Sequence, residues 1–458
     1  MDANKVLNYI KDVVDNMPPD WLTLTTHRLD IYDESKAKTQ FLEQFEALFN
    51  DYNSTPVDIG AALNQLPTAY DYIRLGHPLS SILEWGIARL NNVKPESVIS
   101  FSSKTAPVLA VLRKNLLDNK RTQIVYTGQK PEYLDVEVLH SVYGYYFDLK
   151  HVESASAVPP FNGSTILITA EDEVVETPIA ETPQIDFFVG VHSVIGSVLL
   201  VNGAQNESYI SEIQHVRRRE TIAMTPANCL IALDLLMNNP AAASVNRDYE
   251  AEHSRNKASV LSSIKSITGS PTKALVGSSG LSIQYAIMMG LVHDAQENHK
   301  GKAIKFVVPP NCYGGTNDQA RRVAACIDNV EVVDLPVDGD NDMVQSIDRV
   351  LATIAEENAI PYIIAEIPTN PRVEVPDLEK LKAVLSKERK TAKGETAIDP
   401  VFILDQTFCP NVQFLAKDGI LSSLRTISYV SGSKFPSGGK CTAGYCVTNQ
   451  KAENLLSK

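Results

Sequence analysis

The sequence predicts an α/β protein with a mostly parallel sheet, and three observations support this prediction. From residue 61 onward, short apolar runs alternate with longer segments of helical periodicity, as in strands joined by helices. In the second half, distinctive polar residues follow the apolar runs directly, as at the carboxyl ends of parallel strands. Near residue 240, small residues give way to a highly charged stretch, which indicates a boundary between two α/β domains.

The N-terminal stretch predicts an amphipathic helix. Val6, Ile10 and Val13 recur at three- and four-residue steps, and Pro18 and Pro19 end the pattern. This stretch has neither a basic start nor a continuous apolar run, so we do not interpret it as a signal peptide. We expect residues 1–60 to form a mostly helical segment.

The predicted strands are short apolar runs with helical patterns between many of them. They cover residues 123–126, 164–169, 186–189, 197–201, 303–308, 331–335, 361–365, 401–404, 426–430 and 445–447. The charged segment 386–399 is expected to be a solvated surface loop. Together with the boundary near residue 240, this pattern predicts a first α/β domain over 61–240 and a second over 241–458.

Composition excludes several classes of function. The chain has 458 residues and a net charge of −13, which argues against an electrostatic nucleic-acid binder. No run approaches the roughly 18 consecutive apolar residues of a membrane span. The six cysteines include no Cys-x-x-Cys pair, which is typical of reduced thiols rather than a disulfide framework. We therefore expect a soluble protein of the cytoplasm.

Polar residues follow four predicted strands of the second domain. These segments begin near Tyr313, Asn370, Asp405 and Lys434. In open α/β sheets the ligand crevice lies outside the carboxyl ends of the strands, so the four segments are expected to meet at one site. This convergence is the main argument for an enzyme.

The residue types at these positions indicate a particular chemistry. Lys434 lies among serines and glycines just after a strand, where a Schiff-base lysine can be held rigidly, although a surface lysine is the alternative. A buried Asp405 would be costly alone and would suit a cationic ring nitrogen, with a helix N-cap or metal ligand as alternatives. The Ser-Gly loop before the apolar helix that starts near residue 283 offers backbone N–H groups to an anion, or is a plain helix cap.

Two other kinds of site fail on spacing. The segment that ends in Lys440 and Cys441 lacks both the glycine six residues earlier and the Ser or Thr that a P-loop requires, which argues against a nucleotide-binding ATPase. Cys441 and Cys446 have no partner pair, and none of the nine histidines forms an H-E-x-x-H arrangement, so no metal site is expected.

Five ordered motifs of the second half resemble one family of enzymes. They are Ser279-Gly280-Leu281, Tyr313-Gly314-Gly315-Thr316, Glu366-Ile367-Pro368-Thr369-Asn370-Pro371, Asp405-Gln406-Thr407-Phe408 and Ser431-Gly432-Ser433-Lys434. In order and approximate spacing they resemble the Cys/Met-metabolism family of pyridoxal 5'-phosphate (PLP) enzymes, which includes cystathionine γ-synthases and cystathionine lyases. The resemblance covers residues 246–458 and implies the large domain of an aspartate-aminotransferase-like fold.

The resemblance also implies roles for individual residues. Lys434 would bond to the cofactor as a Schiff base and later move protons, while Tyr313 would stack on the ring and help to activate the incoming amine. Asp405 would pair with the ring nitrogen, Asn370 would lie near the phenolic oxygen and the substrate carboxylate, and Thr407 belongs to the same cofactor-binding set. The phosphate would be held by Ser279, Gly280, Leu281, Ser431 and Ser433.

The sequence departs from the family in two places. Only 24 residues follow Lys434, so the C-terminal domain that carries the substrate-carboxylate arginine is missing, and we expect the chain to be a fragment or to have its site completed otherwise. In the family, a Tyr-x-Arg pair contacts the phosphate of a neighbouring subunit. This pair is absent at Tyr249, because the residue two positions later is Ala251 rather than arginine.

That pair occurs instead in the first half. Tyr72 and Arg74 precede Gly76, His77 and Pro78 in a segment that resembles the family's Y-x-R-x-G-N-P. The first half is therefore interpreted as a degenerate copy whose equivalent of the lysine segment, residues 186–197, contains no lysine. Independent divergence of two α/β domains is the alternative.

In this hypothesis the first half acts as the neighbouring subunit in an internal pseudo-dimer, with a homo-oligomer as the other possibility. Arg74 could instead be a surface salt-bridge residue, and Arg247 and Arg255 are rival phosphate contacts.

The resemblance implies a transsulfuration enzyme with a small amino-acid substrate. The form that we expect is a cystathionine γ-synthase, also described as an O-succinylhomoserine (thiol)-lyase, which replaces the γ-substituent of an O-acylhomoserine in methionine and cysteine metabolism. A cystathionine or methionine lyase is the alternative within the family. A non-catalytic scaffold or regulatory subunit with this fold is the alternative outside it.

Overall fold

The computed structural model describes residues 3–22, 34–52, 58–70, 72–169, 182–238, 245–338, 341–370 and 372–458. The chain divides into two compact units. The first unit comprises Met1–His140 and Tyr145–Glu250, and the second comprises Ser141–Gly144 and Ala251–Lys458. The boundary that the sequence predicts near residue 240 falls within 239–244, outside the described residues.

The first unit begins with helices, as the sequence predicts. They are α1 (Ala3–Asn16), α2 (Glu34–Asp51), α3 (Ile59–Asn64) and α4 (Pro78–Leu90), with a short 3-10 helix at Pro19–Leu22. The predicted apolar stripe of α1 is buried, and Tyr9 packs against the rings of Phe45 and Trp85. Aromatic side chains of α1, α2 and α4 thus form one apolar cluster that joins these helices.

A six-stranded sheet forms the centre of the first unit, in the order β1-β6-β5-β4-β2-β3. Strands β5, β4, β2 and β3 are parallel, whereas β6 runs antiparallel to both β5 and β1. The bounds are β1 (Val98–Phe101), β2 (Thr122–Tyr126), β3 (Phe147–His151), β4 (Ser164–Ile168), β5 (Phe187–His192) and β6 (Gly196–Val201). Its helices are α5 (Ala106–Leu117), α6 (Val136–Ser141), α7 (Ser208–Arg219) and α8 (Pro226–Leu236).

The second unit contains a seven-stranded sheet in the order β7-β13-β12-β11-β10-β8-β9. Its bounds are β7 (Leu275–Gly277), β8 (Ile304–Val308), β9 (Val330–Asp334), β10 (Ile360–Glu366), β11 (Val401–Asp405), β12 (Thr426–Ser431) and β13 (Gly444–Thr448). Strands β12, β11, β10, β8 and β9 are parallel, and β13 is antiparallel to β12 and β7.

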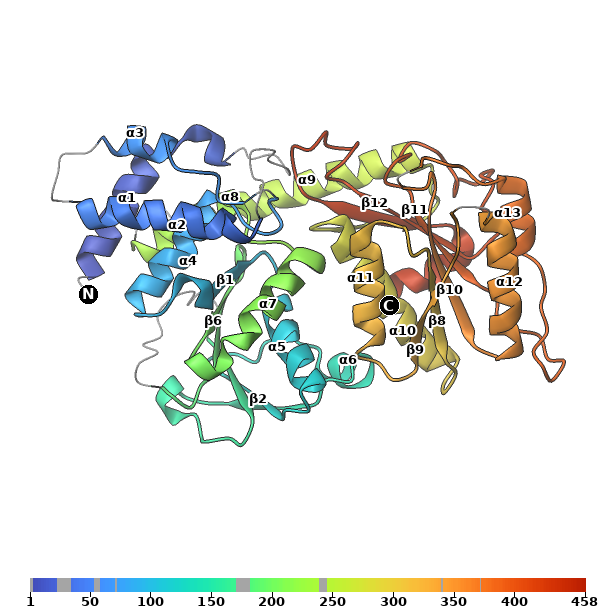
Figure 1. Ribbon diagram of the computed structural model, residues 1–458, viewed down its shortest axis with the longest axis horizontal. Coiled ribbons are helices and arrows are strands. Elements are labelled where there is room, and N and C mark those ends of the chain that lie inside the picture. Colours follow the sequence, from blue (N-terminus) through green and yellow to red (C-terminus); the bar gives the residue numbers. More distant parts are fainter. Residues whose placement is uncertain are drawn as a thin grey trace. The chain divides into compact units, whose positions relative to one another are not determined.

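Helices cover both faces of the second sheet. The helices from residue 245 onward are α9 (Val245–Thr268), α10 (Gly280–Asn298), α11 (Gly314–Ala324), α12 (Met343–Glu356) and α13 (Leu378–Leu385). Helices α10 and α11 lie on one side of the sheet, and α12 and α13 lie on the other (Figure 1). The central strands β8 and β10 are buried along their whole length, as expected for parallel strands between two helical layers.

The predicted α/β class with mostly parallel sheets is confirmed, and every predicted strand is present. Three further strands, β1, β3 and β7, were not predicted. Strand β3 is mostly exposed at a sheet edge and carries charged residues, and β7 is only three residues long and partly exposed. Neither has the buried apolar run from which strands are recognised in a sequence.

The two sheets share a strand order. If β10 is left out, the second sheet reads β7-β13-β12-β11-β8-β9, which matches β1-β6-β5-β4-β2-β3 strand for strand along the chain. In each sheet the second strand of this order, β6 or β13, is antiparallel to both of its neighbours. In this correspondence the β5–β6 hairpin of the first unit takes the place of the β12–β13 connection, which contains Lys434.

Candidate functional site

Four of the predicted site segments follow neighbouring parallel strands. Strands β12, β11, β10 and β8 lie side by side, so their carboxyl ends form one edge of the sheet. Tyr313 follows β8, Asn370 follows β10, Thr407 follows β11 and Lys434 follows β12. The backbone therefore brings these four segments to the same edge.

The Ser-Gly loop forms the start of α10. Ser279 is the N-cap, its hydroxyl accepts from Ser282 N at 3.0 Å, and the Ser282 hydroxyl accepts from Ser279 N at 2.9 Å. This capping box satisfies the N–H groups of Ser279 and Ser282. The N–H groups of Gly280 and Leu281, between them, are first-turn donors without a carbonyl partner within the helix, and such donors suit an anion.

The start of α10 lies against the end of β12. A Cβ atom added at Gly280 would stand 2.8 Å from Cβ of Ser431, so only glycine allows this approach. The hydroxyls of Ser431 and Ser433 lie 2.8 Å apart, and Ser433 is buried. We call Ser279, Gly280, Leu281, Ser431 and Ser433 the hydroxyl cup. The contact at Gly280 joins the two predicted parts of the phosphate site.

Thr407 links the hydroxyl cup to Asp405. Asp405 Oδ1 accepts from Thr407 N at 3.0 Å, and Thr407 Oγ1 accepts from Ser431 N at 3.0 Å. Burial raises the pKa of Asp405, although hydrogen bonds from Thr407 and Tyr429 oppose the shift. The site therefore contains a carboxylate whose charged form lacks full compensation from the protein, and a bound cation would stabilise it.

Gln406 lies between Asp405 and Thr407, and its side chain binds the loop after β11. Its amide nitrogen donates to Cys409 O at 2.8 Å and to Val412 O at 2.5 Å, while its oxygen accepts from the Ser428 hydroxyl at 2.8 Å. These bonds fix the loop after β11 and thus the position of Thr407.

Glu366 is a site residue that was not assigned a role from the sequence. It ends β10 as Asp405 ends β11, and the two are register partners. Its Oε1 accepts from Tyr313 N at 2.7 Å and its Oε2 accepts from Asn370 N at 3.2 Å. The carboxylate thus connects two predicted site residues through their backbones. The signal in the sequence was an acidic residue at the end of an otherwise apolar run.

Tyr313 is the N-cap of α11 and is 37% exposed. Phe408 and Phe435, which follow β11 and β12, are also exposed, and their rings meet edge-on with centroids 6.0 Å apart. Because β8, β11 and β12 end at the same edge of the sheet, the three exposed aromatic side chains come from loops at that edge.

Lys434 is half-buried in the turn after β12. Its backbone N–H donates to Ser431 O at 3.3 Å, and its carbonyl accepts from Gly438 N at 2.8 Å. These bonds hold the backbone of Lys434 directly after Ser433 and three residues after Ser431, which both belong to the hydroxyl cup.

Tyr72 and Arg74 belong to the first unit. Arg74 is only 5% exposed, its Nη1 donates to Arg218 O at 2.8 Å, and its guanidinium lies 4.5 Å from the centroid of the Tyr72 ring. The alternative of a surface salt-bridge residue is therefore wrong, because Arg74 is buried. Of the rival arginines, the side chain of Arg247 lies outside the described residues and Arg255 is exposed on α9.

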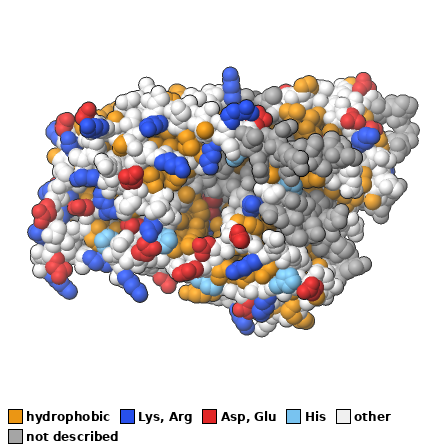
Figure 2. Space-filling model, turned by 180° about the vertical axis from the view of Figure 1, so that it is seen from behind, with side chains coloured by type: hydrophobic (Ala, Val, Ile, Leu, Met, Phe, Trp, Pro, Cys, Tyr) orange, Lys and Arg blue, Asp and Glu red, His pale blue; other side chains and the backbone are white. Residues whose placement is uncertain are grey.

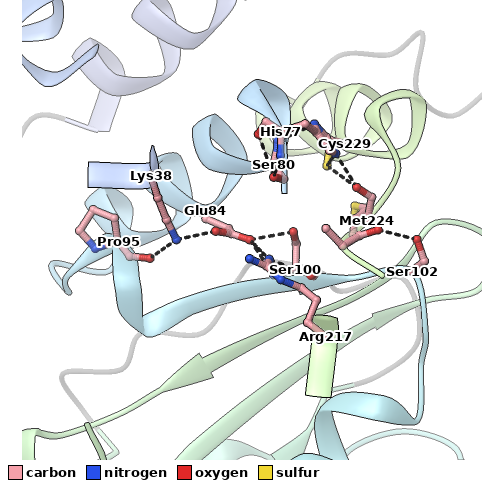
Figure 3. Close-up of polar contacts among 11 residues, drawn as sticks. Lys38, His77, Ser80, Glu84, Pro95, Ser100, Ser102, Arg217, Met224 and Cys229 are labelled. Atoms are coloured by element: carbon pink, nitrogen blue, oxygen red, sulfur yellow. Dashed lines mark hydrogen bonds and ion pairs between the residues drawn. The ribbon is translucent and has the colours of Figure 1, made fainter. Parts of the chain in front are cut away.

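A second group of charged side chains is buried in the first unit (Figure 3). Glu84 accepts from Lys38 Nζ at 2.6 Å and from Arg217 Nη1 at 2.6 Å. Burial alone would raise the pKa of Glu84, but the two cations outweigh it and lower the pKa to about 2. Because all three residues are buried and partnered within the unit, we assign this cluster a structural role that joins α2, α4 and α7.

No group of three or more His, Cys, Asp or Glu side chains suited to a metal ion occurs in the part of the chain that the structure describes. Within the same part, no helix is both long and apolar enough to cross a membrane. Acidic and basic side chains are interspersed on the face that Figure 2 shows, rather than gathered by sign.

No protein-family model and no curated protein sequence matches this chain. Among solved structures, it is similar to a cystathionine gamma lyase (CalE6) from Micromonospora echinospora, with 20% identity, a TM-score of 0.30 and coverage of 42% of both chains. For metB from Corynebacterium glutamicum the identity is 22% and the TM-score 0.29, over 42% of this chain and 43% of the other.

A third similar structure is assigned as an O-acetylhomoserine (thiol)-lyase (metY) from Campylobacter jejuni, and it carries a pyridoxyl-lysine phosphate. Its identity is 17% and its TM-score 0.30, over 43% of this chain and 41% of the other. The chain thus spans less than half the length of each of these proteins, and their activities are not transferred to it.

Proposed function

We propose that the second unit binds PLP and that the chain is a PLP-dependent enzyme of sulfur amino-acid metabolism. The observation that carries the proposal is the contact between the start of α10 and the end of β12, in the same segment as Lys434. The half-buried carboxyl of Asp405, whose pKa is raised, is linked to this contact through Thr407. An anion site, a carboxylate suited to a cation and a lysine are the three groups that PLP requires.

The hydroxyl cup fits a phosphate. It offers the N–H groups of Gly280 and Leu281 at the positive end of a 19-residue helix, together with the hydroxyls of Ser431 and Ser433. The absence of a Cβ at Gly280 lets the two parts stand close enough to hold a single anion. Neutral donors of this kind bind a phosphate without basic side chains.

Asp405 fits a protonated ring nitrogen. Its carboxyl is half-buried and lacks a full-strength counter-charge from the protein, so a cationic pyridine ring would stabilise its ionised form. In turn, the carboxylate would keep that nitrogen protonated. Bound PLP supplies an electron sink for carbanion chemistry, and Asp405 would strengthen it.

The remaining residues position groups and move protons. Lys434 Nζ would bond to the cofactor and then exchange protons with the substrate carbons. Tyr313 would cover the ring and help to deprotonate the incoming amine, and Asn370 would hold the phenolic oxygen and the substrate carboxylate. Thr407 would keep Asp405 in place through its backbone bond.

We further propose γ-replacement on an O-acylhomoserine by a thiol, as in a cystathionine γ-synthase, with a cystathionine or methionine lyase activity as the alternative. This choice rests on the resemblance of the five motifs. The six free cysteines suit a reducing compartment, and we propose that the enzyme acts in the cytoplasm.

The shared strand order supports the proposal that the predicted first domain, residues 61–240, is a degenerate copy of the second. Its β5–β6 hairpin closes with His192 opposite Gly196, where the second unit has Ser431 opposite Gly444 and the loop that contains Lys434. The shorter connection leaves no room for a lysine loop, so this copy would be inert. We propose that it contributes Tyr72 and Arg74 as the neighbouring subunit of an internal pseudo-dimer.

Absorption spectroscopy of the purified protein with PLP tests the cofactor assignment. We expect a visible band that disappears in Lys434→Ala and persists in Lys440→Ala, a matched control in the same loop with an exposed side chain. A colourless wild-type protein would contradict the enzyme proposal and favour a non-catalytic scaffold. Consumption of O-succinylhomoserine with cysteine, compared with consumption of cystathionine alone, then separates the synthase from the lyase.

A further inference from the structure

Glu366 is placed to control the geometry of the site without touching its ligand. It lies at the end of β10, is 7% exposed, and uses one carboxylate oxygen for Tyr313 N and the other for Asn370 N. Tyr313 starts α11, and Asn370 belongs to the loop after β10. A single side chain therefore ties together two loops that come from different strands.

The surroundings of Glu366 decide when it is charged. Burial and then the nearby Asp405 raise the pKa of Glu366 to about 7, while the two backbone N–H groups oppose the shift. The other titratable groups that act on this pair are Tyr429, Cys312 and Cys409, whose pKa values are all raised, so they are neutral near pH 7. Asp405 is thus the neighbouring acidic group whose negative charge raises the pKa of Glu366.

Protonation weakens this connection. An ionised carboxylate accepts with both oxygens, and charge-assisted bonds are about twice as strong as neutral ones. A protonated carboxyl keeps one good acceptor and presents an O–H to the other N–H group. The link between Tyr313 and Asn370 is therefore tight when Glu366 is ionised and loose when it is protonated.

We infer that Glu366 is a positioning residue whose carboxylate holds Tyr313 and Asn370 in place. A cation bound to Asp405 causes Glu366 to release its proton, and the ionised Glu366 then holds the two residues more tightly. The second half of the inference rests on the proposed function, because the cation is the PLP ring nitrogen. The first half concerns the protein alone. Binding of the cofactor would thereby order the two loops that contact it.

Hydrogen exchange of the cofactor-free protein tests the first half. In wild type, the amides of Tyr313 and Asn370 should gain roughly tenfold protection, after correction for intrinsic exchange, between about pH 5.5 and about pH 8.5. Glu366→Gln should remove this pH dependence. Glu374→Gln, an exposed carboxylate of the same loop, should retain it. If protection of the two amides does not change with pH in wild type, the inference is wrong whether or not the variant folds.

Calorimetry of PLP binding in two buffers with different ionisation heats tests the second half. Near pH 6.5, wild type should release up to about one proton more than Glu366→Gln, because only wild type has the carboxyl to ionise. Equal proton release by the two proteins, with PLP bound by both, would overturn the linkage and leave the proposed function intact. Failure of wild type to bind PLP at any pH would instead overturn the proposed function.

Discussion

Asp405 and Glu366 are register partners at the ends of the parallel strands β11 and β10, so two carboxyl groups stand side by side at one edge of the sheet. Burial raises the pKa of both, and the charge of Asp405 raises the pKa of Glu366 further. Because the two groups interact, their protons are best regarded as belonging to the pair. The ionisation of this pair, and with it the charge at this edge of the sheet, therefore changes with pH in the neutral range.

This pairing predicts a pH-dependent stability. The folded pKa of Glu366 exceeds its ordinary value, so the unfolding free energy should fall as pH rises from about 4.5 to about 7. A shift of that size corresponds to about 3 kcal/mol. In urea unfolding, the unfolding free energy of Glu366→Gln should therefore rise relative to that of wild type by up to that amount between about pH 4.5 and about pH 7. Glu374→Gln should follow wild type, and a parallel course of all three proteins would contradict the assignment.

The buried cluster of the first unit should respond strongly to loss of its carboxylate. Glu84→Gln leaves Lys38 and Arg217 buried without a counter-charge and should cost about 3–5 kcal/mol of unfolding free energy. Because the pKa of Glu84 is lowered to about 2, its stabilisation is present above about pH 4.5 and is lost as pH falls toward 2. Lys94→Ala, which breaks an exposed pair with Glu207, should leave the unfolding free energy nearly unchanged.

The backbone approach at Gly444 should not tolerate a side chain. An added Cβ would stand 2.3 Å from the carbonyl oxygen of Ser279, so the start of α10 or β13 must move. We expect Gly444→Ala to lower the unfolding free energy by about 1–3 kcal/mol and to weaken PLP binding. Gly314→Ala, where a Cβ meets nothing within 4 Å, is the matched control. Equal effects of both changes in thermal melts and PLP titrations would argue against the steric explanation.

The pseudo-dimer hypothesis predicts an effect of Arg74 on the cofactor. Arg74→Ala should raise the Kd for PLP roughly tenfold or more, as expected for loss of a charged hydrogen bond to phosphate. Arg89→Ala, which removes an arginine of the same unit that pairs with Glu46, should leave the Kd unchanged. Circular dichroism must show that both variants are folded, since Arg74 also bonds to Arg218 O. An unchanged Kd in folded Arg74→Ala would disprove the hypothesis.

The strands and the order of the site segments could be predicted because both follow from local patterns. Buried strands such as β8 and β10 are continuous apolar runs, and polar residues at their ends mark the edge where parallel strands meet. The capping box at Ser279 and Ser282 is likewise readable from its spacing.

The contacts made at a distance could not be predicted. The pairing of Glu366 with Asp405 depends on the register of β10 and β11, and one residue of slip would turn the side chains to the other face. Glu84 meets Lys38 and Arg217 across 46 and 133 residues of sequence, respectively. Nothing local indicates that Arg74 is buried rather than exposed, because its partner is a backbone carbonyl that lies 144 residues further along.

The place of β13 within its sheet affects how the protein folds as it is made. Strand β13 inserts between β7 and β12, so β7 has no neighbour on its inner side until residues 444–448 have left the ribosome. The start of α10, which follows β7 directly, therefore cannot reach the end of β12 during most of synthesis. Late, non-local strand insertion of this kind is slow and leaves an open strand edge in the meantime. The first sheet closes in the same way, because β6 inserts between β1 and β5, but β1 waits only for residues 196–201. The edge of the nascent second unit should therefore stay open for longer and depend more on chaperones.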